Sequence, residues 1–430
     1  MKLSGSLAPL RHRPFALFWS GAFVSNIGTW METVAVSILV FDATDQKLWA
    51  GLVAAAGFAP GAVLGPFGGV IADRYSRRRT LLITTTAQTL LSITLFVLAA
   101  RGDPAPGAVT LIMLGVGCAN ALGFPSYQAL LPDLVPKEDV VGAVALSSAQ
   151  WNLGRVVGPA LAGVVIHAGG DRWGFAIAFA INSLSFLAVI VVLLVLSLPG
   201  PTPSGRRLRV FRGMRDGFSF SVREPGLRTV VIYMTINSLL AAPFIALVSP
   251  MAKEVLDAGN GGVSALTTAQ GVGAVTMALS LGPLAKAYSS RRVLEAVLWV
   301  LPVALVAYAA SPGIVVAVLM IFVVGAFYLG ALTSFTSIGQ LRAPPEIRGR
   351  VLSVLNVLLG SLYPIGSVVQ GALADRFGQR EVTAGAALLM LLLIASIRIL
   401  RPTFLSALDA PVELSPSDAT DPEGARMVSR

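Results

Sequence analysis

Twelve long apolar segments, separated by short polar stretches, dominate the pattern of this 430-residue chain. Each holds about 20 mostly apolar residues, the length that an α-helix needs to cross the hydrocarbon core of a bilayer. The pattern therefore predicts an all-α polytopic membrane protein with twelve transmembrane helices. The predicted spans are 15–41, 49–72, 80–100, 107–131, 140–168, 173–198, 229–252, 263–287, 293–310, 313–340, 350–371 and 383–400.

A weak internal repeat divides these spans into two sets of six. The stretch Gly69–Arg79 shares its Gly, Ala, Tyr, Ser and two Arg positions with Gly282–Arg292, about half a chain later. A repeat of this length is typical of transporters built from two similar halves. We therefore expect two pseudo-symmetric six-helix bundles with flanking segments. The predicted parts are an N-terminal bundle at 1–198, a cytoplasmic connector at 199–228, a C-terminal bundle at 229–401 and a disordered cytoplasmic tail at 402–430.

The connector contains one short amphipathic pattern. Phe211, Met214, Phe218 and Val222 fall on one helical face, with charged and polar residues elsewhere. This spacing favours a helix that lies on the cytoplasmic membrane surface. The alternative is a solvated linker whose periodicity arises by chance.

Composition and charge fit the membrane class. The chain is 55% hydrophobic and 13% charged, whereas soluble domains carry about 25% charged residues. Its net charge of +10 reflects topology, because 25 of the 32 Lys and Arg fall in segments that are cytoplasmic if the N-terminus is inside. No nucleic-acid motif accompanies the charge. We expect a multi-pass protein of the bacterial cytoplasmic (inner) membrane, with both termini cytoplasmic and membrane lipid, but no nucleic acid, as a partner.

Two motifs resemble those of the major facilitator superfamily. The turn after the second span resembles the family signature of Gly, three residues, Asp, a basic residue, any residue, Gly and further basic residues, with Ser76 in place of the second Gly. The fifth span resembles a motif of the superfamily's antiporters and exporters. The turn supplies Gly69, Asp73, Arg74, Arg77 and Arg78, and the fifth span supplies Gly154, Gly158, Pro159 and Gly163.

Further runs at the N-terminus, in the fifth span and in the connector are similar to the branch that contains enterobactin and macrolide exporters. The resemblance implies two bundles that rock around a central cavity, lined by the first, fourth, seventh and tenth spans. The second, fifth, eighth and eleventh spans would form the seam, and the small residues of the fifth span would pack against the other half. Asp73 would hold the cytoplasmic gate. A monomer is expected.

Two charged residues lie well inside predicted spans, Glu32 in the first and Arg155 in the fifth. Charges are expensive in the hydrocarbon region, so each is a functional candidate. Glu32 is the candidate proton site, because burial away from water favours the neutral form of a carboxyl group. One interpretation makes both residues couple protons or substrate. A second makes them a permanent ion pair, and a third keeps them apart.

Polar and aromatic residues of the spans form a second tier of candidates. Such residues bind substrate in a cavity, or they cross-link and pack helices, which is their commoner role in membranes. The residues predicted to face the substrate are Asn26, Trp30, Asn120, Gln128, Asn237 and Tyr328.

The sequence offers no sign of catalysis. Its two histidines and one cysteine, His12, His167 and Cys118, lie far apart, and it has no phosphate-binding loop. We expect no enzyme activity and no cofactor or metal. The predicted function is a secondary active transporter that exports small amphipathic molecules, drug-like or siderophore-like, in exchange for protons. The alternatives are a lipid or lysolipid flippase, a solute importer or a non-transporting membrane sensor, and sodium is an alternative coupling ion.

Overall fold

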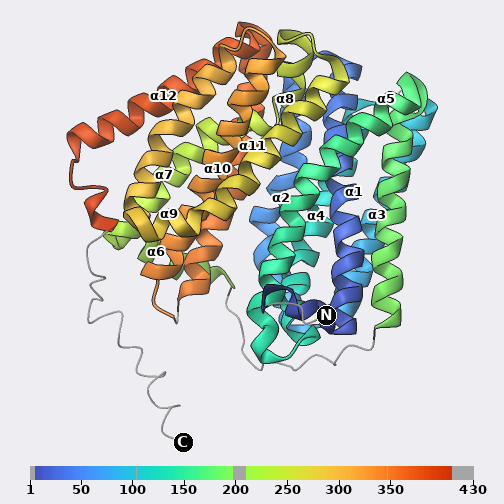
Figure 1. The fold of residues 1–430 in the computed structure, drawn as a ribbon, viewed down its shortest axis with the longest axis horizontal. Helices are drawn as coiled ribbons and strands as arrows, with labels where there is room; N and C mark the ends of the chain where they lie inside the picture. Colours follow the sequence, from blue (N-terminus) through green and yellow to red (C-terminus); the bar gives the residue numbers. More distant parts are fainter. Residues whose placement is uncertain (1–4, 103, 197–209, 346, 409–430) are drawn as a thin grey trace, which may run out of the picture.

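The computed structural model describes residues 5–102, 104–196, 210–345 and 347–408, and Figure 1 shows its helices. Twelve of the described segments are long and apolar enough to cross a membrane, and they correspond one to one to the twelve predicted spans. The described residues contain no strand. The all-α prediction is therefore confirmed. The main helices are α1 (Arg13–Thr44), α2 (Lys47–Arg74), α3 (Arg77–Arg101), α4 (Pro106–Leu130), α5 (Val140–Val195), α6 (Val210–Arg223), α7 (Pro225–Ile236), α9 (Gly259–Ala309), α10 (Ile314–Arg342), α11 (Arg348–Phe377) and α12 (Gln379–Leu400).

Two of these helices each contain two spans joined by a single sharp bend. In α5 the bend lies at Gly170, whose φ of 62° suits a residue without a Cβ. In α9 it lies at Ser289, which takes a φ of 67°. The chain thus turns back across the membrane without a loop at either point. Short helical turns, including α8 (Val248–Pro250), continue α7 toward Val255.

The spans form two bundles that stand side by side (Figure 1). In the first, α1 packs on α5, and α2 on α4; in the second, α9 packs on α10 and α12. The bundles meet where α2 contacts α11 and where α5 contacts α9. Large apolar side chains such as Ile83, Leu111 and Leu279 stay exposed on the outside of the spans, as a lipid environment requires.

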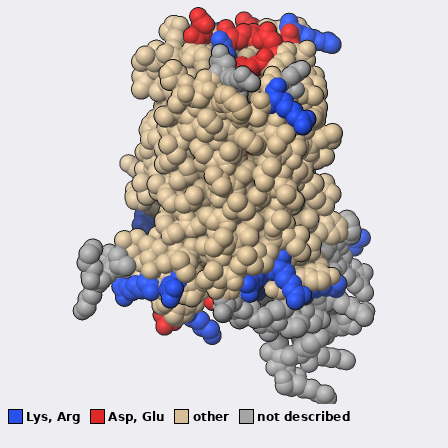
Figure 2. Space-filling model, turned by 90° about the vertical axis from the view of Figure 1, so that its right-hand side faces the viewer, with Lys and Arg blue, Asp and Glu red and all other residues tan. Residues whose placement is uncertain are grey.

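Charged side chains gather at the two ends of the molecule and leave a wide band between them (Figure 2). One end carries mainly Lys and Arg, and we call it the basic end; α1 begins there and α12 ends there. The other carries most of the visible Asp and Glu, and we call it the acidic end. Its acidic residues include Asp42, Asp45, Glu254, Asp375 and Glu381.

A helix, α6, is present where the connector pattern predicts one, and it packs on α11 through its small residues. Ser221 is buried, and a Cβ placed on Gly217 would lie 2.8 Å from the carbonyl oxygen of Arg350. Phe218 and Val222 are exposed. The apolar face therefore points away from the bundle, as a membrane-surface helix requires. The connector residues 199–209 and the side chain of Phe211 lie outside the described part.

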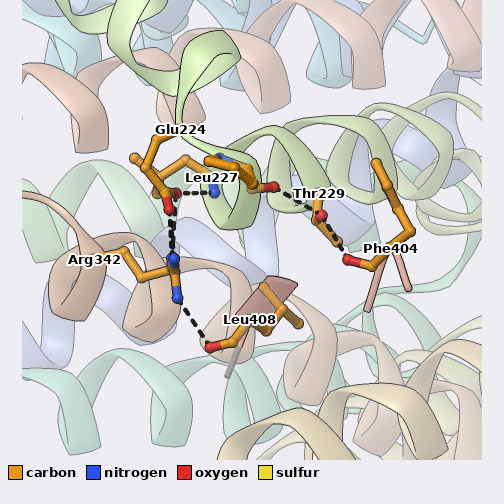
Figure 3. Close-up of polar contacts among 7 residues, drawn as sticks. Glu224, Leu227, Thr229, Arg342, Phe404 and Leu408 are labelled. Carbon is orange, nitrogen blue, oxygen red and sulfur yellow. Dashed lines mark hydrogen bonds and ion pairs between the residues drawn. The ribbon is translucent and has the colours of Figure 1, made fainter. Parts of the chain in front are cut away.

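The start of the predicted tail is not disordered. Leu405 is buried, the carbonyl of Phe404 accepts a hydrogen bond from Thr229, and that of Leu408 accepts one from Arg342 (Figure 3). The prediction was wrong for 402–408 because apolar residues and free carbonyls at this point find partners at the basic end of α7 and α10. Residues 409–430 lie outside the described part of the chain.

Candidate functional site

A cationic and aromatic cluster lies halfway along the spans of the first bundle. Trp151 and Arg155 are four residues apart on α5, so they share one face of the helix. Both meet Trp30 of α1. The centroids of the Trp30 and Trp151 rings lie 5.5 Å apart, and the Arg155 guanidinium lies 5.6 Å from the centroid of the Trp30 ring. This geometry is a cation–π interaction with an edge-on second indole.

The second bundle completes this cluster. Tyr328 of α10 and Tyr363 of α11 lie near Arg155. Phe244 stacks edge-on against Tyr328 at 5.6 Å between centroids, and Phe58 of α2 does the same against Tyr363 at 5.1 Å. We name Trp30, Trp151, Arg155, Tyr328 and Tyr363 the central cluster. It is a site where one guanidinium and aromatic rings from both bundles meet.

Glu32 does not belong to the central cluster. It is buried in the first bundle, where its carboxylate accepts hydrogen bonds from Ser92 Oγ at 2.5 Å and Asn182 Nδ2 at 2.7 Å. It is two positions after Trp30 in the sequence, which places the two side chains on nearly opposite faces of α1. The considered ion pair between Glu32 and Arg155 is therefore absent, and Glu32 instead links α1 to α3 and to the second span of α5.

The other predicted substrate contacts are spread over the two bundles. Tyr328 lies in the central cluster, and Asn26 lies against Gly154. Asn237 is fully buried, and neither oxygen nor nitrogen of its amide has a hydrogen-bond partner among the described residues. Asn120 and Gln128 are exposed on α4. The structure thus brings Trp30, Arg155 and Tyr328 together. Asn26 lies one helical turn before Trp30, on the same face of α1.

The small residues of the fifth span have two different partners. A Cβ on Gly158 would lie 2.6 Å from the Trp30 Cβ and 2.8 Å from the Ile27 carbonyl oxygen. Gly154 likewise faces Asn26, so both glycines hold α1 within the same bundle. Gly163 instead meets Ser264 of α9 in the other bundle. Among the glycines of this motif, the expected packing on the other half is therefore found only for Gly163. Pro159 is buried next to Gly158.

Replacing Gly158 by Val should destabilise the first bundle and displace Trp30. The added atoms would press on the α1 backbone, which cannot yield as a flexible side chain does, and such overpacking typically costs about 1–3 kcal/mol. Gly61→Val is the matched control, because a Cβ on Gly61 meets no atom within 4 Å. Thermal unfolding in detergent should show a clear drop for Gly158→Val only. Equal melting temperatures would contradict this packing.

The seam between α2 and α11 has a regular register. From the acidic end, Leu48 lies against Gly371, Gly51 against Ser367, Phe58 against Tyr363 and Ala62 against Gly360. The two helices run antiparallel, so the same spacing continued toward the basic end places Gly69 opposite Ser353 and Asp73 opposite Gly349. That part of the seam is not closed, since a Cβ on Gly69 or Gly349 meets no atom within 4 Å and Asp73 is exposed.

Polar contacts between the bundles gather at the acidic end. Asp375, near the end of α11, accepts hydrogen bonds from the backbone N–H groups of Lys47 at 2.7 Å and Leu48 at 3.0 Å. These N–H groups belong to the first turn of α2 and have no partner within their own helix. The helix dipole favours a carboxylate at this position. The remaining contacts are ion pairs of Lys47 with Glu254 and of Lys253 with Asp42, and a hydrogen bond between Ser37 and Ser249.

The sequence around Asp375 is a signature copy that the sequence analysis missed. Gly371, Asp375, Arg376 and Gly378 match the Gly, Asp, basic and Gly positions of the signature, including the second Gly that the turn after α2 lacks, and Arg380 follows after one uncharged residue, Gln379. A glycine is favoured at position 378, because its φ is 96° and residues with a Cβ rarely adopt that value. The signal that identifies this copy is the Gly, three residues, Asp, Arg, any residue, Gly spacing, which is the same as the family signature.

The copy at the turn after α2 makes contacts within its own bundle. Arg77 pairs with Asp133 and donates to the Ala129 carbonyl, and Arg78 donates to the Leu194 carbonyl. Arg74 is exposed, and Asp73 forms no hydrogen bond or ion pair with the described residues. Of the two signature copies, the one at the acidic end is therefore engaged across the seam and the one at the basic end is not.

Comparison with known proteins agrees with the fold. Residues 4–422 match the family model described as transmembrane secretion effector. The chain is 28% identical to the multidrug efflux pump Tap of Mycolicibacterium fortuitum, over 88% of this chain and 94% of that protein. It is 26% identical to an enterobactin exporter EntS of Escherichia coli, over 95% and 96%, and 23% identical to macrolide efflux protein A of Streptococcus pyogenes, over 85% and 90%.

Among solved structures, the fold is similar to a bacterial homologue of the human lysosomal transporter Spinster in an inward-facing, occupied conformation. The TM-score is 0.74 at 14% identity, over 95% of this chain and 99% of that one. At this identity the likeness concerns the fold alone.

Proposed function

Since the chain belongs to the major facilitator superfamily, in its family of transmembrane secretion effectors, we propose that it exports small amphipathic organic molecules in exchange for protons. It does so by alternating access in the bacterial cytoplasmic membrane. The excess of Lys and Arg at the basic end supports placing that end, with both termini, in the cytoplasm. The acidic end then faces outward.

The half-closed seam between α2 and α11 is the observation that carries this proposal. It is packed from the acidic end to the middle and open from there to the basic end. This asymmetry is what an inward-facing state of a rocking transporter requires. The opposite state would close the basic half of the same seam and open the acidic half.

The two signature copies give each state its own polar contact. In the inward-facing state Asp375 caps the start of α2. In the outward-facing state Asp73 would cap the start of α11 near Gly349, in the same way and from the opposite direction. A carboxylate at a helix N-terminus contributes about 0.3–1 kcal/mol, or about 2 in partly buried sites. Exchanging one cap for another keeps the states close in free energy, so substrate and protons can shift the balance.

Glu32 is the proposed proton site. Its carboxylate joins α1 to α3 and α5 through Ser92 and Asn182, and α1 also carries Trp30 of the central cluster and Ser37 of the acidic end. Protonation replaces a buried charge by a neutral group and changes both hydrogen bonds. A proton taken up here would therefore alter the position of the helix that reaches both the substrate site and the seam.

Proton flux driven by substrate tests the proposal. The purified protein, in liposomes with an internal pH dye, is challenged with dyes, macrolides and catecholate siderophores. We expect proton movement with one compound class, and we expect Glu32→Gln to abolish it. Glu138→Gln, at an exposed position of the basic end, is the control and should behave as wild type.

The other outcomes separate the alternatives. Substrate flux with the same pH dependence in Glu32→Gln would remove Glu32 from the coupling and favour another ion. Movement of a lysolipid between leaflets, without flux of the soluble compounds, would favour a flippase. Binding without any flux would favour a sensor.

A further inference from the structure

We propose that the central cluster binds an oxyanion of the substrate, a carboxylate or a phenolate carried on an aromatic body, and that Arg155 is its ligand. This inference rests on the proposed export function and names the class of molecule that the same site takes. It concerns charge: the site should prefer an anion to a neutral or cationic molecule of the same shape.

The guanidinium of Arg155 has unused hydrogen-bonding capacity. It carries five N–H donors, yet within the described residues it forms no hydrogen bond and no ion pair. It lies over the face of Trp30, and Tyr328 and Tyr363 are nearby. A cation in the middle of a membrane protein is expensive without a partner, and such residues normally pair. An anionic ligand supplies the partner that the chain does not.

Among the side chains that the structure describes, no carboxylate of the spans takes that place. Glu32 is held by Ser92 and Asn182 on another face of α1. Glu295, which opens the second span of α9, pairs with Arg398. The other acidic residues that the structure describes near the bundles lie at the two ends, among them Asp42 and Glu254 in the ion pairs of the acidic end. The positive charge of Arg155 is thus left for a molecule that enters between the bundles.

The groups around Arg155 define the rest of the ligand. Aromatic rings approach from both bundles, which suits a flat aromatic body. The indole Nε1 of Trp30 is buried and has no hydrogen-bond partner in the described chain. It is a second donor of the central cluster without a partner. Arginine binds carboxylate through two parallel hydrogen bonds, so a carboxylate attached to a ring fits the guanidinium and the aromatic rings around it.

The site should discriminate by charge. A cationic drug placed among these rings would meet the like charge of Arg155 in a region of low dielectric, where repulsion is strong. A neutral ester of the same acid would keep the ring contacts and lose the charge-assisted hydrogen bonds. Hydrogen bonds to charged groups are stronger than those between neutral groups.

The test compares 1-naphthoate with its methyl ester on the purified full chain in detergent micelles. Binding is followed by quenching of tryptophan fluorescence and checked by equilibrium dialysis. We expect naphthoate to bind about 10- to 100-fold more tightly than the ester. Arg155→Gln should remove that difference, and Arg155→Lys should retain part of it. Arg101→Gln, at the acidic end of α3, is the control for a lost surface charge, and gel filtration verifies that each variant is folded.

Equal binding of acid and ester, an effect of Arg155→Gln on both alike, or no binding of naphthoate to wild type would overturn the inference. The same pair is then assayed for flux in liposomes, which separates the two proposals. Binding of naphthoate without flux would support the anion site and contradict the proposed export. Equal flux of the acid and the ester, unchanged in Arg155→Gln, would support the proposed export and contradict the anion site. A lysophospholipid that displaces naphthoate would identify the oxyanion as a lipid phosphate.

Discussion

A disulfide between cysteines introduced at Ser37 and Ser249 should stop transport completely and reversibly. The two Oγ atoms lie 2.7 Å apart, on α1 and on α8 of the opposite bundle, so paired sulfur atoms can reach bonding distance there. The bond would hold the acidic end closed, and alternating access requires that end to open. Oxidation should therefore abolish flux, and a reductant should restore it. The background variant is Cys118→Ser, because Cys118 is the only cysteine of the chain.

Each single-cysteine variant is the control for this cross-link and should transport normally under oxidant. A second pair, at Gly69 and Ser353, tests the open part of the seam. Because that part is open in this structure, these cysteines should cross-link slowly at rest and faster during turnover, when the basic end closes. Undiminished flux in the oxidised 37–249 pair would show that the bundles do not separate at the acidic end, and alternating access in this form would then be wrong.

The spans were predictable because each one satisfies a local requirement. Every backbone group in hydrocarbon must be bonded within its own helix, and about 20 apolar residues are needed to cross. Both conditions can be read from the sequence without knowing any neighbour. The ends are harder, because they depend on partners. α1 extends to Thr44 and α11 to Phe377, several residues beyond the predicted limits, where they meet the acidic ends of other helices.

The sequence predicted several of the residues that belong to the site but not which of them contact one another. An Arg and a Glu inside spans are conspicuous, but their partners come from other helices at sequence separations of 60 and 150 residues for Glu32. Arg155 contacts aromatic rings instead of Glu32 because α1 is turned about its axis so that Trp30, and not Glu32, faces Arg155. The sequence does not specify that orientation. The signature at 371–380 was visible in the sequence, but the comparison of the two halves pairs the turn after the second span with Gly282–Arg292 and not with this stretch.

The ion pair between Glu224 and Arg342 fixes the basic end of the second bundle (Figure 3). Their side chains are only 4% and 7% exposed. Glu224 accepts from Arg342 Nε at 3.1 Å and also caps α7 by accepting from the Leu227 N–H at 2.5 Å. Arg342 in turn donates to the Leu408 carbonyl at 3.0 Å. One carboxylate thus joins the start of α7, the end of α10 and the segment that follows α12.

Glu224→Ala should lower the free energy of unfolding by about 3–5 kcal/mol, because removing one partner of a buried pair leaves the other charge without compensation. The cap of α7 is lost as well. Asp216→Ala is the matched control: its pair with Arg350 is long, at 3.4 Å, and both side chains are more than two-fifths exposed, so its loss should cost about 0–1 kcal/mol. Unfolding by SDS in mixed micelles measures both. Adding Arg342→Leu to Glu224→Ala should recover part of the loss, since the uncompensated charge is then gone. Equal stability of the two single variants would mean that this contact does not hold the basic end together.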